Sequence, residues 1–172
     1  MKRWVFFWTL AISVPAFAGG MALSVPLIDR GTGTLYVEGK IGSQGPVSFL
    51  LDTGSSFSTI DQAMLERLQR QGEVKYLRTQ AGMLANGARI EVPLYRVRHL
   101  QIGKRCTVPD IEVAVFPHNK RVILGLNVLS RISPFEISVD PPRLSMTGCE
   151  VLAASSTRRL EPSLAILPQK AR

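Results

Sequence analysis

One carboxylate of this sequence stands in a setting suited to acid–base chemistry. Asp52 follows an apolar run, Val47–Leu51, and precedes Thr53, Gly54 and Ser55. Such a run predicts a buried strand, which would deliver the carboxylate into a turn. Thr53 can bond to backbone inside the turn, Gly54 permits close approach of another backbone, and Ser55 can donate a hydrogen bond that favours the ionised carboxylate. The alternative is an ordinary turn, because all these residue types favour turns.

Other catalytic patterns do not occur in the sequence. The stretch Gly33–Lys40 is one residue too long for a phosphate loop, and Ile41 follows it instead of Ser or Thr. There is no G-x-S-x-G elbow. His99 lies in a strand pattern and His118 in a polar turn, so we interpret both as structural or solvated. The two Cys and two His lack zinc-site spacing. Asp52 therefore remains the candidate, and we expect neither a metal nor an organic cofactor.

Short strands and turns must position Asp52. Alternation predicts a strand over Thr34–Ile41, ahead of the apolar run, and Phe57–Ile60 fits a short strand after the turn. Asp61 is a suitable N-cap for a helix over Gln62–Gln71, whose apolar residues share one face, and Gly72 would end that helix.

The second half of the chain continues in strands. Asn86-Gly87 predicts a tight hairpin turn, and Pro93 predicts a strand edge or a bend. The stretch Leu126–Ile132 suits one short helix. Further strands are predicted over Val74–Thr79, Tyr95–Ile102, Cys106–Phe116, Val122–Leu124, Phe135–Val139 and Arg143–Thr147. Many short strands with one or two helices predict a small all-β barrel or sandwich.

The N-terminus has the pattern of an export signal. Two basic residues precede an uncharged run that ends in a small-x-small pattern at Ala18, which predicts a signal peptide over residues 1–18. The alternative is an uncleaved membrane anchor, because no charge occurs between Trp4 and Asp29. We expect an exported protein, periplasmic or secreted, or one anchored with its domain outside the cytoplasm.

The remainder divides into a segment over residues 19–32, one domain over 33–152 and a flexible basic tail over 153–172. A chain of 172 residues, 45% of them apolar, suffices for one core. Residues 1–18 contain two of the 21 basic residues and none of the 13 acidic ones, so their removal lowers the net charge from +8 to +6. The charges are spread out, which indicates solvated surface, and we expect no nucleic-acid partner. The alternative is a β-barrel that uses the charge of +6 to bind lipid or nucleic acid.

The two cysteines, Cys106 and Cys149, form an even pair. Outside the cytoplasm such a pair favours a disulfide, which would tie the middle of the chain to its last strand. The alternative is a pair of buried free thiols.

Three motifs, taken in order, resemble the retropepsin-like aspartic proteases, in particular exported bacterial relatives of retroviral proteases. They are the catalytic Asp-Thr-Gly, a flap hairpin and an apolar-apolar-Gly brace for the catalytic loop. The matching residues are Asp52, Thr53 and Gly54 for the loop, Met83, Leu84, Ala85, Asn86 and Gly87 for the flap, and Ile123, Leu124 and Gly125 for the brace. The resemblance spans about Gly33–Thr147. It implies an all-β fold, a small closed β-barrel of the retropepsin (acid protease) type with one or two short helices.

The sequence departs from the retroviral pattern in two places. Ser55 stands where retroviral proteases usually have Ala. The flap lacks a very Gly-rich tip, and Met83, Leu84 and Asn86 would make it stiffer.

The resemblance implies an aspartic endopeptidase that needs two carboxylates. The chain has one Asp-Thr-Gly, so the second carboxylate would come from another copy, and we expect a homodimer that cleaves polypeptides. Thr53 would bond to Thr53 of the partner subunit. The segments Met21–Arg30 and Phe135–Thr147 are candidates for an interface sheet. The alternative is a non-catalytic module of the same fold that binds a peptide or an envelope protein.

Overall fold

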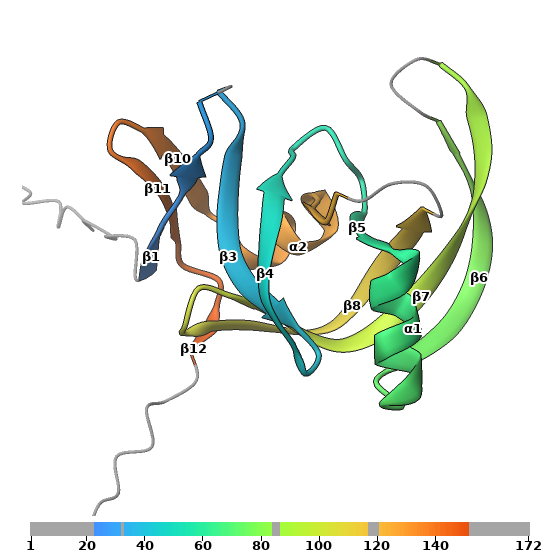
Figure 1. Ribbon diagram of the computed structural model, residues 1–172. Coiled ribbons are helices and arrows are strands. Elements are labelled where there is room, and N and C mark those ends of the chain that lie inside the picture. Colours follow the sequence, from blue (N-terminus) through green and yellow to red (C-terminus); the bar gives the residue numbers. More distant parts are fainter. Residues whose placement is uncertain (1–22, 32, 84–86, 117–120, 152–172) are drawn as a thin grey trace, which may run out of the picture.

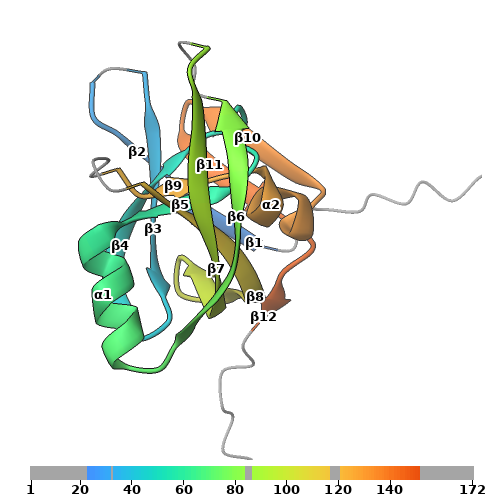
Figure 2. The same cartoon turned by 90° about the vertical axis from the view of Figure 1, so that its right-hand side faces the viewer.

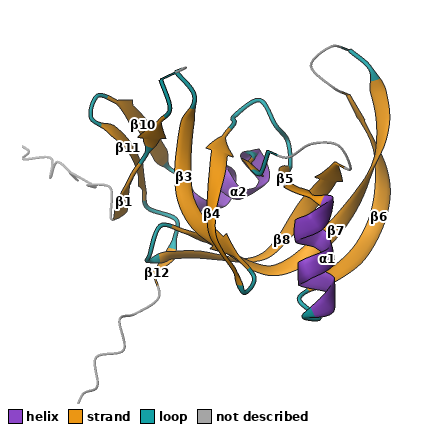
Figure 3. Ribbon diagram, in the orientation of Figure 1, coloured by secondary structure: helices purple, strands orange, loops and turns teal. Residues whose placement is uncertain are grey.

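The computed structural model describes residues 23–31, 33–83, 87–116 and 121–151. Over these ranges the chain consists mainly of strands with short helices (Figure 3), so the predicted all-β class is confirmed. No helix in these ranges is long and apolar enough to cross a membrane.

Six strands of the larger sheet pair in a ring around the core. In ring order they are β8 (Cys106–Phe116), β5 (Ser58–Asp61), β9 (Ile123–Leu124), β4 (Gln44–Leu51), β3 (Leu35–Ile41) and β7 (Arg89–Ile102), and β7 pairs with β8 again. Three further strands pair with strands of this ring without being part of it: β6 (Val74–Met83) with β7, β12 (Glu150–Val151) with β8 and β2 (Ile28–Asp29) with β3. Alternate side chains point inward along β3 and β4, and Val37, Ile41 and Phe49 are fully buried.

A second, three-stranded sheet joins the two ends of the described chain. Its order is β1 (Leu23–Pro26), β11 (Pro142–Met146) and β10 (Phe135–Val139), all antiparallel, and it stands beside the larger sheet in Figure 1. The two segments predicted as interface candidates therefore lie side by side. Leu23 and Val25, which precede the domain boundary expected at residue 33, are buried in the same core cluster as residues of the larger sheet.

Both predicted helices occur, with one change. The helix α1 (Gln62–Arg70) begins after Asp61, whose carboxylate accepts a hydrogen bond from the Met64 N–H at 2.6 Å, as predicted for an N-cap. The second predicted helix divides into α2 (Leu126–Leu129) and a 3₁₀ turn, Ser130–Ile132. Figure 2 shows α1 and α2 at opposite sides of the strands.

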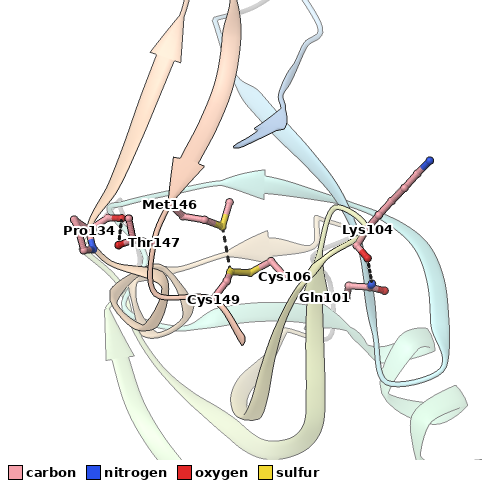
Figure 4. Close-up of a disulfide and its surroundings, with 7 residues drawn as sticks. All are labelled: Gln101, Lys104, Cys106, Pro134, Met146, Thr147 and Cys149. Atoms are coloured by element: carbon pink, nitrogen blue, oxygen red, sulfur yellow. Dashed lines mark hydrogen bonds between the residues drawn. A yellow bond between two sulfur atoms is a disulfide. The ribbon is translucent and has the colours of Figure 1, made fainter. Parts of the chain in front are cut away.

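Cys106 and Cys149 are joined by a disulfide, with their Cα atoms 5.2 Å apart (Figure 4). Cys106 begins β8 of the larger sheet, and Cys149 follows β11 of the smaller one. The Cys149 Sγ also lies 3.3 Å from the Met146 Sδ. The bond therefore fastens the end of the small sheet to the large one.

Candidate active site

Strand β9 holds Asp52 at the end of β4. The Leu50 N–H donates to the Val122 carbonyl at 2.8 Å, and the Asp52 N–H donates to the Leu124 carbonyl at 3.2 Å. The loop then runs from Asp52 to Phe57 before β5 begins. Figure 1 shows this loop and the upper, coloured ends of β6 and β7 at the same end of the molecule.

The first turn of the loop is built on Asp52 itself. Its Oδ1 accepts a hydrogen bond from the Gly54 N–H at 2.9 Å, and its carbonyl accepts one from the Ser55 N–H at 3.3 Å. Asp52 is half-buried, whereas Thr53 and Gly54 are exposed. Bonds of this kind also occur in ordinary Asp turns, so the turn alone does not distinguish the two interpretations.

The predicted hydrogen bond from Ser55 to the carboxylate is wrong. The Ser55 hydroxyl donates instead to the Phe57 carbonyl at 2.7 Å, within its own loop. The Ser55 hydroxyl therefore shapes the loop and does not donate to the Asp52 carboxylate.

The predicted brace residues lie directly against the loop. Ile123 and Leu124 form β9, which pairs with β4 on one side and β5 on the other. Gly125 packs so closely that a Cβ atom there would lie 2.5 Å from the carbonyl carbon and oxygen of Phe57. Only glycine fits without moving the loop backbone.

Sequence reasoning missed two residues that tie the brace to the loop. The Asn127 Oδ1 accepts hydrogen bonds from the Ser58 N–H at 2.7 Å and from the Ser58 hydroxyl at 3.0 Å. The Asn127 Nδ2 donates to the Glu112 carbonyl at 2.7 Å, and the Ser58 Oγ accepts a hydrogen bond from the Gly125 N–H at 3.0 Å. The only sequence signal was an amide residue two positions after the brace glycine.

The predicted flap is the hairpin of β6 and β7. Met83 ends β6 with 70% of its surface exposed, and Gly87 has a positive φ of 81°. Leu84, Ala85 and Asn86 lie outside the described residues. The tight turn predicted at Asn86-Gly87 falls partly on these residues, and the last described pair of the hairpin joins Met83 to Arg89.

Pro93 lies within β7, which runs unbroken through it. It pairs with Thr79 of β6, and the pairing of β7 with β8 begins one residue later, at Leu94. Pro93 therefore lies at a strand edge only on the side of β7 that faces β8, because it precedes the first residue of β7 that pairs with β8.

An ion-pair cluster fixes the base of the flap hairpin to β8. Arg78 of β6 contacts the Glu112 carboxylate at 2.9 Å and Arg96 of β7 contacts it at 3.6 Å. The hydrogen bond from Arg78, reinforced by the charges of both arginines and opposed by burial, lowers the pKa of Glu112. The Asn127 side chain donates to the carbonyl of the same Glu112. Glu112 therefore contacts both the base of the flap hairpin and the loop brace.

In one chain, the site contains the Asp52 carboxylate and an exposed apolar side chain that follows the brace. Leu126, next to Gly125, is 42% exposed although it is a leucine. Within the described ranges, no group of three or more His, Cys, Asp or Glu residues is arranged to hold a metal ion. The chain therefore offers a braced, half-exposed carboxylate beside uncovered loop and apolar surface.

Comparison with known proteins assigns this fold and site to a class. The fold is similar to the crystal structure of a retropepsin-like aspartic protease from Rickettsia conorii, with a TM-score of 0.52 and 20% sequence identity, over 72% of this chain and 90% of that one. A family model described as aspartyl protease matches residues 37–128, more than half of the chain. The chain belongs to this aspartyl protease family. No curated protein matches it.

Proposed function

We propose that the protein is an aspartic endopeptidase that acts as a homodimer, with Asp52 of each copy supplying half of the catalytic pair. The observation that supports this most directly is the braced Asp52 turn, in which β9, Gly125 and Ser58 hold one carboxylate in a fixed loop. An ordinary turn has no need of such a support.

The chemistry requires two carboxylates in different protonation states. Carboxylates about 3 Å apart share one proton, because both cannot remain ionised at that distance. The ionised one takes a proton from water as the water oxygen attacks the scissile carbonyl carbon, while the protonated one donates a hydrogen bond to the carbonyl oxygen. The first carboxyl then transfers the proton that it took from water to the amide nitrogen, so the C–N bond breaks and the two peptides are released.

The surface around the loop supports a two-fold assembly. Thr53 and Gly54 are exposed beside Asp52, and Leu126 places an uncovered apolar side chain next to them. A second copy would cover all three while bringing in Asp52 of the partner subunit. The edge strands β1 and β10 of the small sheet also have one unpaired side each in that sheet, where strands of a second copy can add.

We further propose that the domain works outside the cytoplasm, on polypeptide substrates. The Cys106–Cys149 disulfide supports an oxidising compartment, and the export signal expected at residues 1–18 agrees with it. Periplasmic, secreted and membrane-anchored forms share this placement.

The central experiment replaces Asp52 by Asn in the full chain. Cleavage of an unfolded protein mixture, followed from acidic to neutral pH, should fall at least about a hundredfold. The matched control is Glu66→Gln, the same acid-to-amide change at an exposed position of α1, which should leave cleavage unchanged. Undiminished cleavage by the Asp52→Asn protein would refute the proposal, and binding of peptides without any cleavage by the wild type would favour a non-catalytic module.

Mixing experiments test the shared site. Wild-type chains are re-equilibrated with increasing Asp52→Asn chains, so that mixed dimers form with one carboxylate each. If both carboxylates are needed, activity per wild-type chain falls in proportion to the wild-type fraction. A monomeric enzyme would instead keep the same activity per wild-type chain at every ratio, with sedimentation reporting the assembly state of each mixture.

A further inference from the structure

A hollow lined by two arginines lies beside β4, the strand that leads to Asp52. Its volume is about 330 Å³, and we call it the arginine pocket. Its lining residues are Arg30, Tyr36, Val47, Ser48, Arg121 and Val122. They include two guanidinium groups and no acidic side chain, so the hollow suits an anionic group with an apolar stem.

One of the two guanidinium groups is held in place before any ligand arrives. The Arg30 Cζ lies 4.2 Å from the centroid of the Tyr36 ring, and its Nη2 donates to the Ser48 Oγ at 2.9 Å. That bond uses one of the five N–H donors of a guanidinium. Because stacking and the hydrogen bond already order the side chain, binding an anion costs it little further entropy.

The acidic residues nearby do not neutralise Arg30. Glu38 stands opposite Ser48 in the β3–β4 register, but no salt bridge joins it to Arg30. Among the described residues, no salt bridge involves Arg30. The arginine pocket therefore keeps a positive potential near its mouth.

The pocket lies within reach of a substrate bound at Asp52. Ser48 precedes Asp52 by four residues on β4, and a strand rises about 3.3 Å per residue, so the two are within about 13 Å along the strand. Val122, which also lines the pocket, accepts a hydrogen bond from the Leu50 N–H through its carbonyl. An extended peptide that ran alongside β4 would advance by a similar rise, so its third or fourth residue from the scissile bond would reach the pocket.

We propose that the arginine pocket is a specificity subsite for an acidic side chain, Asp or Glu, three or four residues from the scissile bond. This rests on the proposed peptidase function. A guanidinium pairs with a carboxylate through two parallel N–H···O bonds, and Arg30 and Arg121 both line the pocket. Since the proposed dimer is symmetric, the preference holds on both sides of the cleaved bond.

The test uses peptides blocked at both ends, in which Glu or Gln occupies each position around one cleavage site. At the third or fourth position the wild-type protein should cleave the Glu peptide with a kcat/KM about tenfold higher than the Gln peptide. Arg30→Gln and Arg121→Gln should each reduce this ratio to about threefold or less, leaving the Gln peptide unaffected. The control Arg105→Gln removes an exposed arginine outside the pocket and should keep the full ratio.

A wild-type ratio near one at every position, or an undiminished ratio in both pocket variants, would overturn the proposal. Acid preference that appears only when the peptide has a free terminal carboxylate would also overturn it, because the ligand would then be a chain end. The peptidase function is judged separately, by loss of cleavage in Asp52→Asn. That inactive variant also provides a binding measurement, in which the Glu peptide should bind about tenfold more tightly than the Gln peptide.

Discussion

Asn127 is predicted to hold the catalytic loop in place, and Asn127→Ala tests this. The substitution removes the acceptor for both the N–H and the hydroxyl of Ser58. Ser58 is only 1% exposed, so water cannot easily replace the lost acceptor. An unpaired buried donor costs about 1–3 kcal/mol, and the Ser58 hydroxyl adds a smaller amount because it can turn elsewhere.

Loss of the hydrogen bond from the Asn127 Nδ2 to the Glu112 carbonyl adds little to this loss of stability. Glu112 and Asn127 both line a hollow of about 150 Å³, so we expect water to take the place of the amide there. We therefore expect Asn127→Ala to lower the free energy of unfolding by about 2–3 kcal/mol. Because the same contacts position the residues after Asp52, kcat should fall by about a hundredfold.

Asn127→Asp is the matched control, because it keeps the Oδ1 acceptor for Ser58. It also replaces the donor to the Glu112 carbonyl with a negatively charged oxygen, so it should lose some stability but retain more activity than the Ala variant. Both variants are measured by urea unfolding at one fixed protein concentration, since dimer formation adds to stability, with circular dichroism as the signal. If the Ala variant lies within about 0.5 kcal/mol of wild type, the role assigned to the Ser58 contacts is wrong.

Two further predictions concern the flap base and the disulfide. The folded-state pKa of Glu112 is lowered from its ordinary 4.5, so its stabilising effect is fully present above pH 4.5 and is lost as pH falls through the folded-state pKa. Glu112→Gln should cost at most about 1 kcal/mol above that pH, with the deficit shrinking in more acidic buffer, and a deficit independent of pH would contradict this. Replacing Cys106 and Cys149 together by Ser opens a link with a sequence separation of 43 and should lower the free energy of unfolding by about 2–4 kcal/mol. Wild-type protein unfolded with and without a reducing agent provides the comparison, and equal midpoints would refute it.

Features set by short stretches of sequence were predictable. The N-cap at Asp61 and the buried face of α1 follow from residues within one helix, and the strands β3 and β8 follow from alternation or from runs of β-branched residues. The Asp-Thr-Gly turn and the brace glycine were recognisable for a related reason, because each demands particular residue types at adjacent positions.

Contacts between distant stretches were not predictable from residue types. Ser58 and Asn127 are 69 positions apart, and nothing local indicates that one amide will bond to that serine. The hydroxyl of Ser55 had two candidate acceptors nearby, and the path of the loop backbone selected the carbonyl of Phe57. The place of Leu23–Pro26 in a sheet likewise depends on β11, more than a hundred residues later.

The contacts around Asp52 indicate which parts of the proposed site one chain supplies and which a second copy would supply. Each contact that holds the loop, from β9, Gly125 and Asn127, lies within the single copy. In the proposed homodimer, a second copy would therefore not be needed to shape the loop; it would supply the other carboxylate and cover Leu126. Dimer formation and loop geometry should accordingly be separable: a charge placed at Leu126 should abolish activity by preventing assembly while leaving the fold of each chain intact.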